Sequence, residues 1–258
     1  DDIAVMYRTN AQSRVIEDEL RHLSIPYRIY GGTSFYQRKE IKDAIAYFRI
    51  AVNPADNEAL LRVINYPIRG IGDTTLSVIS TVGRVSEAAR VAGVPLFEVI
   101  CDPDGAKAEV ATATKKKLTD FAQMIQRFAQ RAETEDAYSF AEDVLRESGV
   151  MRDAKQDTSQ EGVARLENLQ EMLAGIHEYV EARKKQGTDF TPMTDFLAEV
   201  SLLTDQDERQ DDEQPRVTLL TVHSAKGLEF RVAFIVGLEE NLFPSQFCQS
   251  PKDLEEER

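Results

Sequence analysis

The chain has 258 residues, 42% of them hydrophobic and 29% charged, a composition typical of one or two folded domains. No apolar run approaches the roughly 18 residues that a membrane helix requires, and no basic-then-apolar leader opens the chain. Cys101 and Cys248 fit no disulfide framework, and the three histidines have no zinc-like spacing. We therefore expect no metal site and no membrane partner, and a reducing, cytoplasmic location.

Charge is distributed unevenly along the chain. The formal net charge is −14, but residues 1–100 hold 12 basic and 12 acidic side chains and sum to zero, so residues 101–258 carry the whole −14. DNA affinity depends on cationic contacts to phosphate. We expect any polyanion site in the first hundred residues or in small local patches elsewhere.

The first 32 residues predict a β-α-β unit, the building block of a parallel sheet. Ile3–Tyr7 is an apolar run typical of a buried strand, Ala11–Leu23 has helical periodicity, and Tyr27–Tyr30 predicts a second strand that Gly31 ends. The helical spacing of Val15, Ile16, Glu19, Leu20 and Leu23 predicts that this helix buries a face made mostly of apolar side chains.

Further strands are predicted only at residues 216–222 and 232–237. Between residues 33 and 213 the pattern is helical, with helices expected at Ile41–Val52, Leu60–Ile64, Leu118–Arg131, Tyr138–Ser148 and Arg165–Lys184. The fold class is therefore α/β, a discontinuous parallel-sheet domain (1–32 and 214–258) interrupted by a large all-α insertion (33–213). The acidic segment Asp205–Gln214, which contains no apolar residue, is interpreted as a solvated linker.

Residues 221–230, Thr-Val-His-Ser-Ala-Lys-Gly-Leu-Glu-Phe, follow a predicted strand directly. They should lie at the carboxyl end of that strand, the edge where open α/β sheets bind ligands. The segment combines hydroxyls, an imidazole, an ammonium and a carboxylate, more polar groups than a structural turn needs. A plain polar connection is the alternative interpretation.

Arg69-Gly70-Ile71-Gly72 resembles the turn of a helix-hairpin-helix motif. Glycines allow a phosphate to approach the main chain, and amides at a helix start point at the anion. Arg38, Lys39 and Lys42 add a basic patch, with Arg38 and Lys42 predicted on one helix face. A simple turn between helices is the alternative.

The segment at 7–14, Tyr-Arg-Thr-Asn-Ala-Gln-Ser-Arg, follows the first predicted strand. Either Thr9 or Asn10 could cap the next helix, which is the structural interpretation. Arg8 and Asn10 are also candidate phosphate contacts.

Six ordered segments together resemble the UvrD/PcrA/Rep family of superfamily 1A DNA helicases. They are 7–14, Tyr-Gly-Gly at 30–32, Arg-Lys-Glu-Ile-Lys-Asp-Ala at 38–44, Arg-Gly-Ile-Gly at 69–72, Arg-Leu-Glu-Asn-Leu at 165–169, and 221–230, which is similar to motif V. Phe243-Pro244-Ser245 and residues 254–258 are similar to the run that leads into motif VI.

The resemblance implies an ATP-dependent DNA helicase of the 3′–5′ type, acting in repair or replication. The chain would be part of the second RecA-like domain, 2A (1–32 and 214–258), with the inserted domain 2B (33–213). No Gly-x-x-x-x-Gly-Lys-Ser/Thr phosphate loop is present, nor the family's other ATPase motifs. We therefore expect a piece of a longer enzyme that contains no catalytic residue and does not hydrolyse ATP alone.

The resemblance also assigns residues. Nucleotide binding would fall to Gly227 and Glu229. Single-stranded DNA would contact Arg8, Thr9, Asn10, Thr221, His223 and Ser224. Duplex DNA would contact Lys39, Lys42, Arg69, Gly70, Gly72 and Thr74. Arg165, Glu167 and Asn168 are interpreted as structural.

The implied cofactors are ATP and Mg²⁺ in the full-length enzyme, with none expected on this piece. The implied partners are single-stranded and duplex DNA, the 1A/1B half of the same chain and a regulatory protein on 2B, in the cytoplasm near the nucleoid. Two other classes stay open at this point: a stand-alone helix-hairpin-helix DNA-binding module and a regulatory protein-interaction module. A phosphate loop upstream in the gene and a motif VI downstream would distinguish them.

Overall fold

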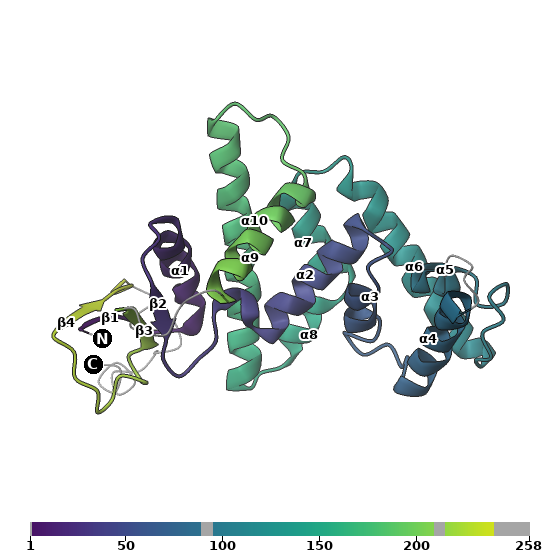
Figure 1. Ribbon diagram of the computed structural model, residues 1–258, viewed down its shortest axis with the longest axis horizontal. Helices are drawn as coiled ribbons and strands as arrows, with labels where there is room; N and C mark the ends of the chain where they lie inside the picture. Colours follow the sequence, from purple (N-terminus) through teal and green to yellow (C-terminus); the bar gives the residue numbers. More distant parts are fainter. Residues whose placement is uncertain (1, 89–94, 209–214, 240–258) are drawn as a thin grey trace. The chain divides into compact units, whose positions relative to one another are not determined.

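The computed structural model describes residues 2–88, 95–208 and 215–239 (Figure 1). The chain forms two compact units. The sheet unit comprises residues 1–38 and 200–258, and the helical unit comprises residues 39–199. Within the described residues, no helix is long and apolar enough to cross a membrane.

Four parallel strands form the sheet, in the order β2-β3-β1-β4 (Figure 1). They are β1 (Ile3–Tyr7), β2 (Tyr27–Ile29), β3 (Val217–Thr221) and β4 (Val232–Ile235). β3 enters from the far end of the sequence and pairs with both β1 and β2. The predicted α/β class with a discontinuous parallel sheet is confirmed.

The helix after β1 buries a different face from the one predicted. A short 3-10 turn, η1 (Asn10–Gln12), leads into α1 (Ser13–His22). Val15 is 53% exposed and Leu23 is 58% exposed, so their predicted burial is wrong. Ile16 and Leu20 do pack against the sheet's apolar cluster of Tyr7, Tyr27 and Leu219. The other buried face is polar and consists of Ser13, Arg14, Glu17 and Arg21.

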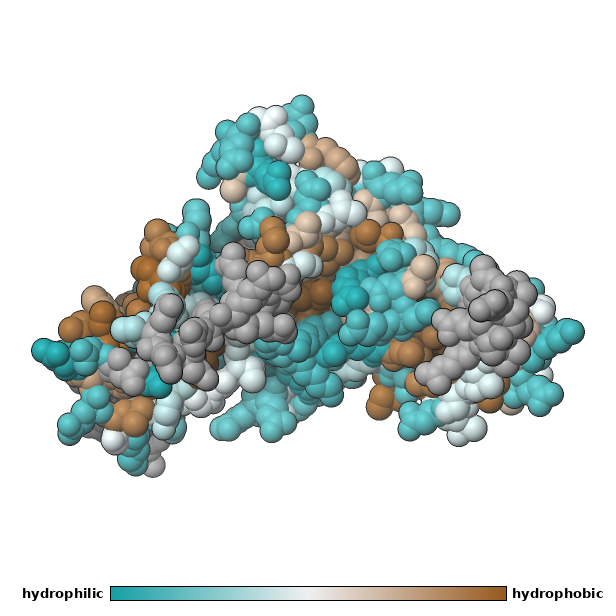
Figure 2. Space-filling model, in the orientation of Figure 1, coloured by the Kyte–Doolittle hydropathy of each residue, from teal (hydrophilic) through white to brown (hydrophobic). Residues whose placement is uncertain are grey.

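Hydrophobic residues are also visible on the surface of the sheet unit. On the face in Figure 2 they lie over α1 and the strands. Phe234 and Ile235 of the edge strand β4 are 54% and 51% exposed.

The helical unit contains no strand among its described residues, as predicted. Its helices are α2 (Lys39–Val52), α3 (Asn57–Val63), α4 (Asp73–Ala88), α5 (Leu96–Cys101), α6 (Thr112–Ala132), α7 (Ala137–Glu147), α8 (Val150–Gln156) and α9 (Gln160–Lys185). α10 (Met193–Glu208) spans the division between the units. Side-chain caps mark several starts: Asp56 precedes α3, Asp136 precedes α7 and Ser159 precedes α9.

Packing in the helical unit centres on aromatic side chains. Tyr47, Phe48, Phe128 and Phe140 are fully buried, and the rings of Phe48 and Phe140 lie 6.3 Å apart. Asn168 of α9 is also buried and donates to Glu40 of α2, so it joins the two helices.

The compact units divide between Arg38 and Lys39 and between Glu199 and Val200. The predicted bounds of 1–32 and 214–258 for one domain and 33–213 for the other stay a prediction. Residues 205–208 of the expected acidic linker are helical, as the end of α10. Residues 209–214 lie outside the described residues, as do Phe243-Pro244-Ser245 and residues 254–258. The identification of the two units with 2A and 2B remains a prediction.

Candidate nucleic-acid interface

The two segments predicted to bind a single strand begin side by side. Tyr7, the last residue of β1, is in register with Thr221, the last residue of β3. The Val222 amide then donates to the Tyr7 carbonyl at 2.9 Å. The polar residues that follow each strand therefore leave the sheet at the same edge.

A third segment, Gly31-Gly32 after β2, reaches the same edge. A Cβ on Gly31, whose φ is +73°, would lie 3.3 Å from the Ser224 Oγ. A Cβ on Gly32 would lie 4.0 Å from the Asn10 Oδ1. These glycines were not among the predicted site residues. Their signal was a pair of glycines directly after a strand.

Thr221 and Ser224 form a pair of half-buried hydroxyls. Their oxygens are 2.9 Å apart, and the Ser224 amide donates to the Thr221 Oγ1 at 3.2 Å. The mutual bond uses one hydroxyl proton, so the other can donate to a ligand. His223, between them in sequence, is exposed.

Gln12 shapes the turn that follows β1. Its Oε1 accepts from the amides of Arg8 and Thr9, each at 2.9 Å. Thr9 is the N-cap residue of η1, and Asn10 is exposed. Gln12 was missed, although a Gln three residues after a Thr is the spacing of a capping box.

The predicted nucleotide residues lie in the turn beyond the hydroxyl pair. Gly227 has φ +84°, and a Cβ there would meet no atom within 4 Å. Glu229 is exposed, and its carboxylate makes no hydrogen bond or ion pair with any residue in the described ranges. The main chain of Gly227 and the acid of Glu229 are thus open to a ligand.

In the helical unit, the predicted phosphate-binding turn connects α3 to α4, and its arginine is engaged within the protein. The Arg69 guanidinium lies 5.2 Å from the Phe121 ring centroid. It donates to four carbonyls and one hydroxyl, those of Val63 (3.2 Å), Tyr66 (2.8 Å), Pro67 (3.1 Å), Ser148 (2.8 Å) and Tyr47 (2.7 Å). Arg69 therefore holds the turn in place.

Asn65 fixes the main chain of the same turn. Its Oδ1 accepts from the amides of Arg69 and Ile71, both at 3.0 Å, and Ile71 is fully buried. The Gly72 carbonyl accepts from the amides of residues 75 and 76, which starts α4 as predicted. The turn presents Gly70, Gly72 and Thr74, which are all exposed. Asn65 and Tyr47 were missed because their partners follow from the folded turn.

Of the predicted basic patch of Arg38, Lys39 and Lys42, Arg38 does not lie on the surface. Arg38 is 8% exposed, donates to the Ser13 Oγ at 2.7 Å and lies 3.9 Å from Glu17, so its predicted place on a basic surface is wrong. The burial of Glu17 is the physical reason, because a buried carboxylate requires cationic partners. Lys39 is exposed and Lys42 half-buried on the first turn of α2.

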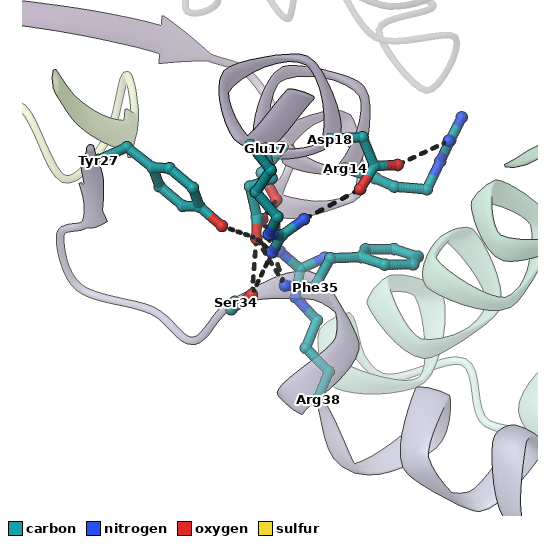
Figure 3. A network of polar contacts seen from close by, with 9 residues as sticks. Arg14, Glu17, Asp18, Tyr27, Ser34, Phe35 and Arg38 are labelled. Carbon is teal, nitrogen blue, oxygen red and sulfur yellow. Dashed lines mark hydrogen bonds and ion pairs between the residues drawn. The ribbon is translucent and has the colours of Figure 1, made fainter. Parts of the chain in front are cut away.

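Glu17 is the centre of a buried polar network (Figure 3). Its carboxylate accepts hydrogen bonds from Ser13 (2.6 Å), Ser34 (2.7 Å), Arg21 (3.0 Å), Tyr27 (3.3 Å) and the Phe35 amide (3.1 Å). These contacts tie residues 34–38 to α1, which explains why this segment belongs to the sheet unit. They also hold α1, which directly follows the 3-10 turn that begins with Asn10.

Asp18, beside this network, bridges Arg14 at 3.2 Å and Arg21 at 3.0 Å. Burial raises the pKa of Asp18 to about 6, against the opposing effect of the two guanidinium groups.

Comparison with known proteins places the chain in a family. Residues 1–258 match the family described as the UvrD-like helicase C-terminal domain. The chain is 39% identical to the ATP-dependent DNA helicase PcrA of Leuconostoc citreum, 38% identical to DNA helicase II of Escherichia coli (strain K12) and 37% identical to PcrA of Bacillus subtilis (strain 168). Each alignment covers all of this chain and 34% of the relative, so the chain spans about a third of their length. The resemblance in the motifs is thereby confirmed: the chain belongs to the UvrD-like helicase family, as its C-terminal domain.

Proposed function

We propose that this chain is the part of an ATP-dependent DNA helicase that holds single-stranded DNA at its sheet edge and duplex DNA on its helical unit. The observation that carries the proposal is the meeting of three segments at one edge of the sheet, where Gly31 approaches Ser224 and Gly32 approaches Asn10. The relatives' names, which describe ATP-dependent DNA helicases, support the same activity.

At the sheet edge, Asn10, Thr221, Ser224 and His223 supply an amide, two hydroxyls and an imidazole. Arg8 and Thr9 precede them on the turn that Gln12 caps. These groups suit the phosphates and sugars of a strand and carry no base recognition. We therefore expect binding that is independent of DNA sequence, with contacts suited to a strand that moves past.

On the helical unit, the proposed duplex contacts are Lys39, Lys42, Gly70, Gly72 and Thr74. The two exposed glycines leave the main chain open to a phosphate. Arg69 takes a different role in this proposal from the one expected from sequence. Five acceptors within the protein occupy its guanidinium, so it shapes the turn instead of binding phosphate directly.

The full-length enzyme would use ATP and Mg²⁺, whose phosphoryl-transfer chemistry supplies the energy for translocation. In this chain, the Glu229 carboxylate would accept a hydrogen bond from a ribose hydroxyl, and the open space beside Gly227 fits a close nucleotide. The 1A/1B half would complete the ATP site. The 3′–5′ polarity, the nucleoid location and the inactivity of this chain alone in ATP hydrolysis are parts of the same proposal.

Binding of a fluorescent 20-nucleotide oligo-dT to the 258-residue chain tests the proposal. Asn10→Ala with Ser224→Ala should lower the affinity about thirtyfold, because each of the two lost hydrogen bonds is worth about 1 kcal/mol. Thr194→Ala, which removes an exposed hydroxyl from α10 in the helical unit, should leave the affinity unchanged. Equal affinities for all three proteins would contradict the proposed single-strand site.

A further inference from the structure

The turn at residues 69–72 has a cation beside it that comes from another helix. Lys117 of α6 donates from its Nζ to the Gly70 carbonyl at 3.2 Å. A Cβ placed on Gly70 would lie only 2.6 Å from the same nitrogen. The absence of a side chain at Gly70 is therefore what allows the ammonium to lie against the turn.

The Lys117 ammonium keeps donors available. It has three N–H groups, and the Gly70 carbonyl is its one acceptor among the residues in the described ranges. Lys117 is exposed, and it forms no ion pair with any residue in the part of the chain that the structure describes. Two N–H donors thus face solvent next to exposed main chain.

The neighbouring lysines of α6, Lys115 and Lys116, differ from Lys117 in their hydrogen bonds and ion pairs. Lys115 is paired with Asp104. Lys116 is exposed like Lys117, but its ammonium makes no hydrogen bond or ion pair with the turn among the described residues. Lys116 therefore offers a matched control with the same charge, the same helix and the adjacent position.

We infer that Lys117 is a phosphate ligand of the duplex-binding turn, and that it supplies the cation which Arg69 does not. The inference rests on the proposed duplex contact at Gly70 and Gly72. In it, α6 contributes the charge while the stretch from α3 to α4 contributes the open main chain. A lysine suits this position because its ammonium binds phosphate as a point charge, without the fixed two-pronged geometry of arginine.

The test is the salt dependence of binding to a 20-base-pair duplex of mixed sequence, measured by fluorescence anisotropy with the 258-residue chain. Lys117→Gln should make the slope of log K against log salt shallower by about 0.9, the value for one lost phosphate contact. Lys117→Arg should retain the slope, and Lys116→Gln should change it by much less than Lys117→Gln. Circular dichroism melting checks that each variant is folded.

The salt slopes of these variants show whether Lys117 binds phosphate. A wild-type slope in Lys117→Gln, with duplex binding intact, would overturn the role of Lys117 and leave the proposed function standing. Equal changes in Lys116→Gln and Lys117→Gln would reduce the effect to general charge and overturn the specific contact. No duplex binding by the wild-type chain would overturn both this inference and the proposed duplex contact.

Discussion

The Arg69 guanidinium donates to the main-chain carbonyl of Ser148 at 2.8 Å, although the two residues are 79 positions apart in the sequence. The bond joins the turn before α4 to the end of α7. Together with three carbonyls of residues 63–67, it makes Arg69 a cross-link within the helical unit. The sequence at residues 69–72 resembles a ligand-binding motif, but its Arg69 stabilises the fold of the helical unit.

Replacing Arg69 by alanine should therefore destabilise the helical unit. The change removes five partly buried hydrogen bonds, at a cost of about 2–4 kcal/mol. Urea unfolding measures the loss. Arg146→Ala, at a side chain that is 63% exposed, is the control and should cost far less. A stable Arg69→Ala protein with a shallower salt slope for duplex binding would instead identify Arg69 as a phosphate ligand.

Glu17→Ala should be among the most damaging single changes in the sheet unit. Arg21 and Arg38, at 6% and 8% exposed, would lose a buried carboxylate partner. Breaking a buried ion pair on one side costs about 3–5 kcal/mol. Glu19→Ala, at an exposed position on the same helix, serves as the comparison in thermal unfolding. Similar melting temperatures for the two variants would refute the importance of the network.

Asp18 should titrate near pH 6 in the folded chain, which a carboxyl-carbon NMR titration can measure. Between pH 4 and 6 the folded state then binds more protons at Asp18 than the unfolded state, whose carboxyl has a pKa of roughly 3.9. The contribution of Asp18 to stability is therefore largest below about pH 4 and declines as pH rises through 6. The difference in unfolding free energy between wild type and Asp18→Asn should decline over the same interval; a difference that grows with pH would contradict the shift.

Gly31→Ala should weaken binding of a single strand. The new methyl group would lie 3.3 Å from the Ser224 Oγ and disturb the hydroxyl pair, in addition to straining a residue with φ +73°. Gly187→Ala is a matched control, because φ there is +90° and a Cβ would meet no atom within 4 Å. Both variants should lose about 1 kcal/mol of stability from the backbone alone. Only Gly31→Ala should lower affinity for oligo-dT, and equal affinities would show that Gly31 is remote from the site.

The sequence predicts the strands of the fold well, since a buried parallel strand is a short apolar run that depends little on its neighbours. β1 (Ile3–Tyr7) and β3 (Val217–Thr221) are found where they were expected. The burial of α1 was predicted less well. Periodicity identifies apolar positions, but Glu17 and Arg21 are buried because their partners, such as Ser34, lie on a segment that only the fold brings near.

At the candidate site, too, the sequence shows which residues are polar but not which distant partners they contact in the fold. Thr221, Ser224 and Asn10 could be chosen from sequence because polar residues directly after a strand lie at the ligand-binding edge. For the basic residues, sequence position does not distinguish Arg38 and Arg69, whose side chains bind other parts of the protein, from Lys42, a proposed phosphate contact. A basic side chain in sequence does not show whether its partner is a phosphate or a carboxylate and carbonyls elsewhere in the chain.

In the proposed function, the carboxyl edge of the sheet holds single-stranded DNA. Hydrogen exchange of the 258-residue chain, with and without a saturating 20-nucleotide oligo-dT, shows which segments the DNA covers. DNA binding at this edge should slow exchange at residues 8–12, 30–32 and 222–227, three segments that meet only in the folded sheet unit. Protection confined to other parts of the chain, with these three segments unchanged, would contradict it.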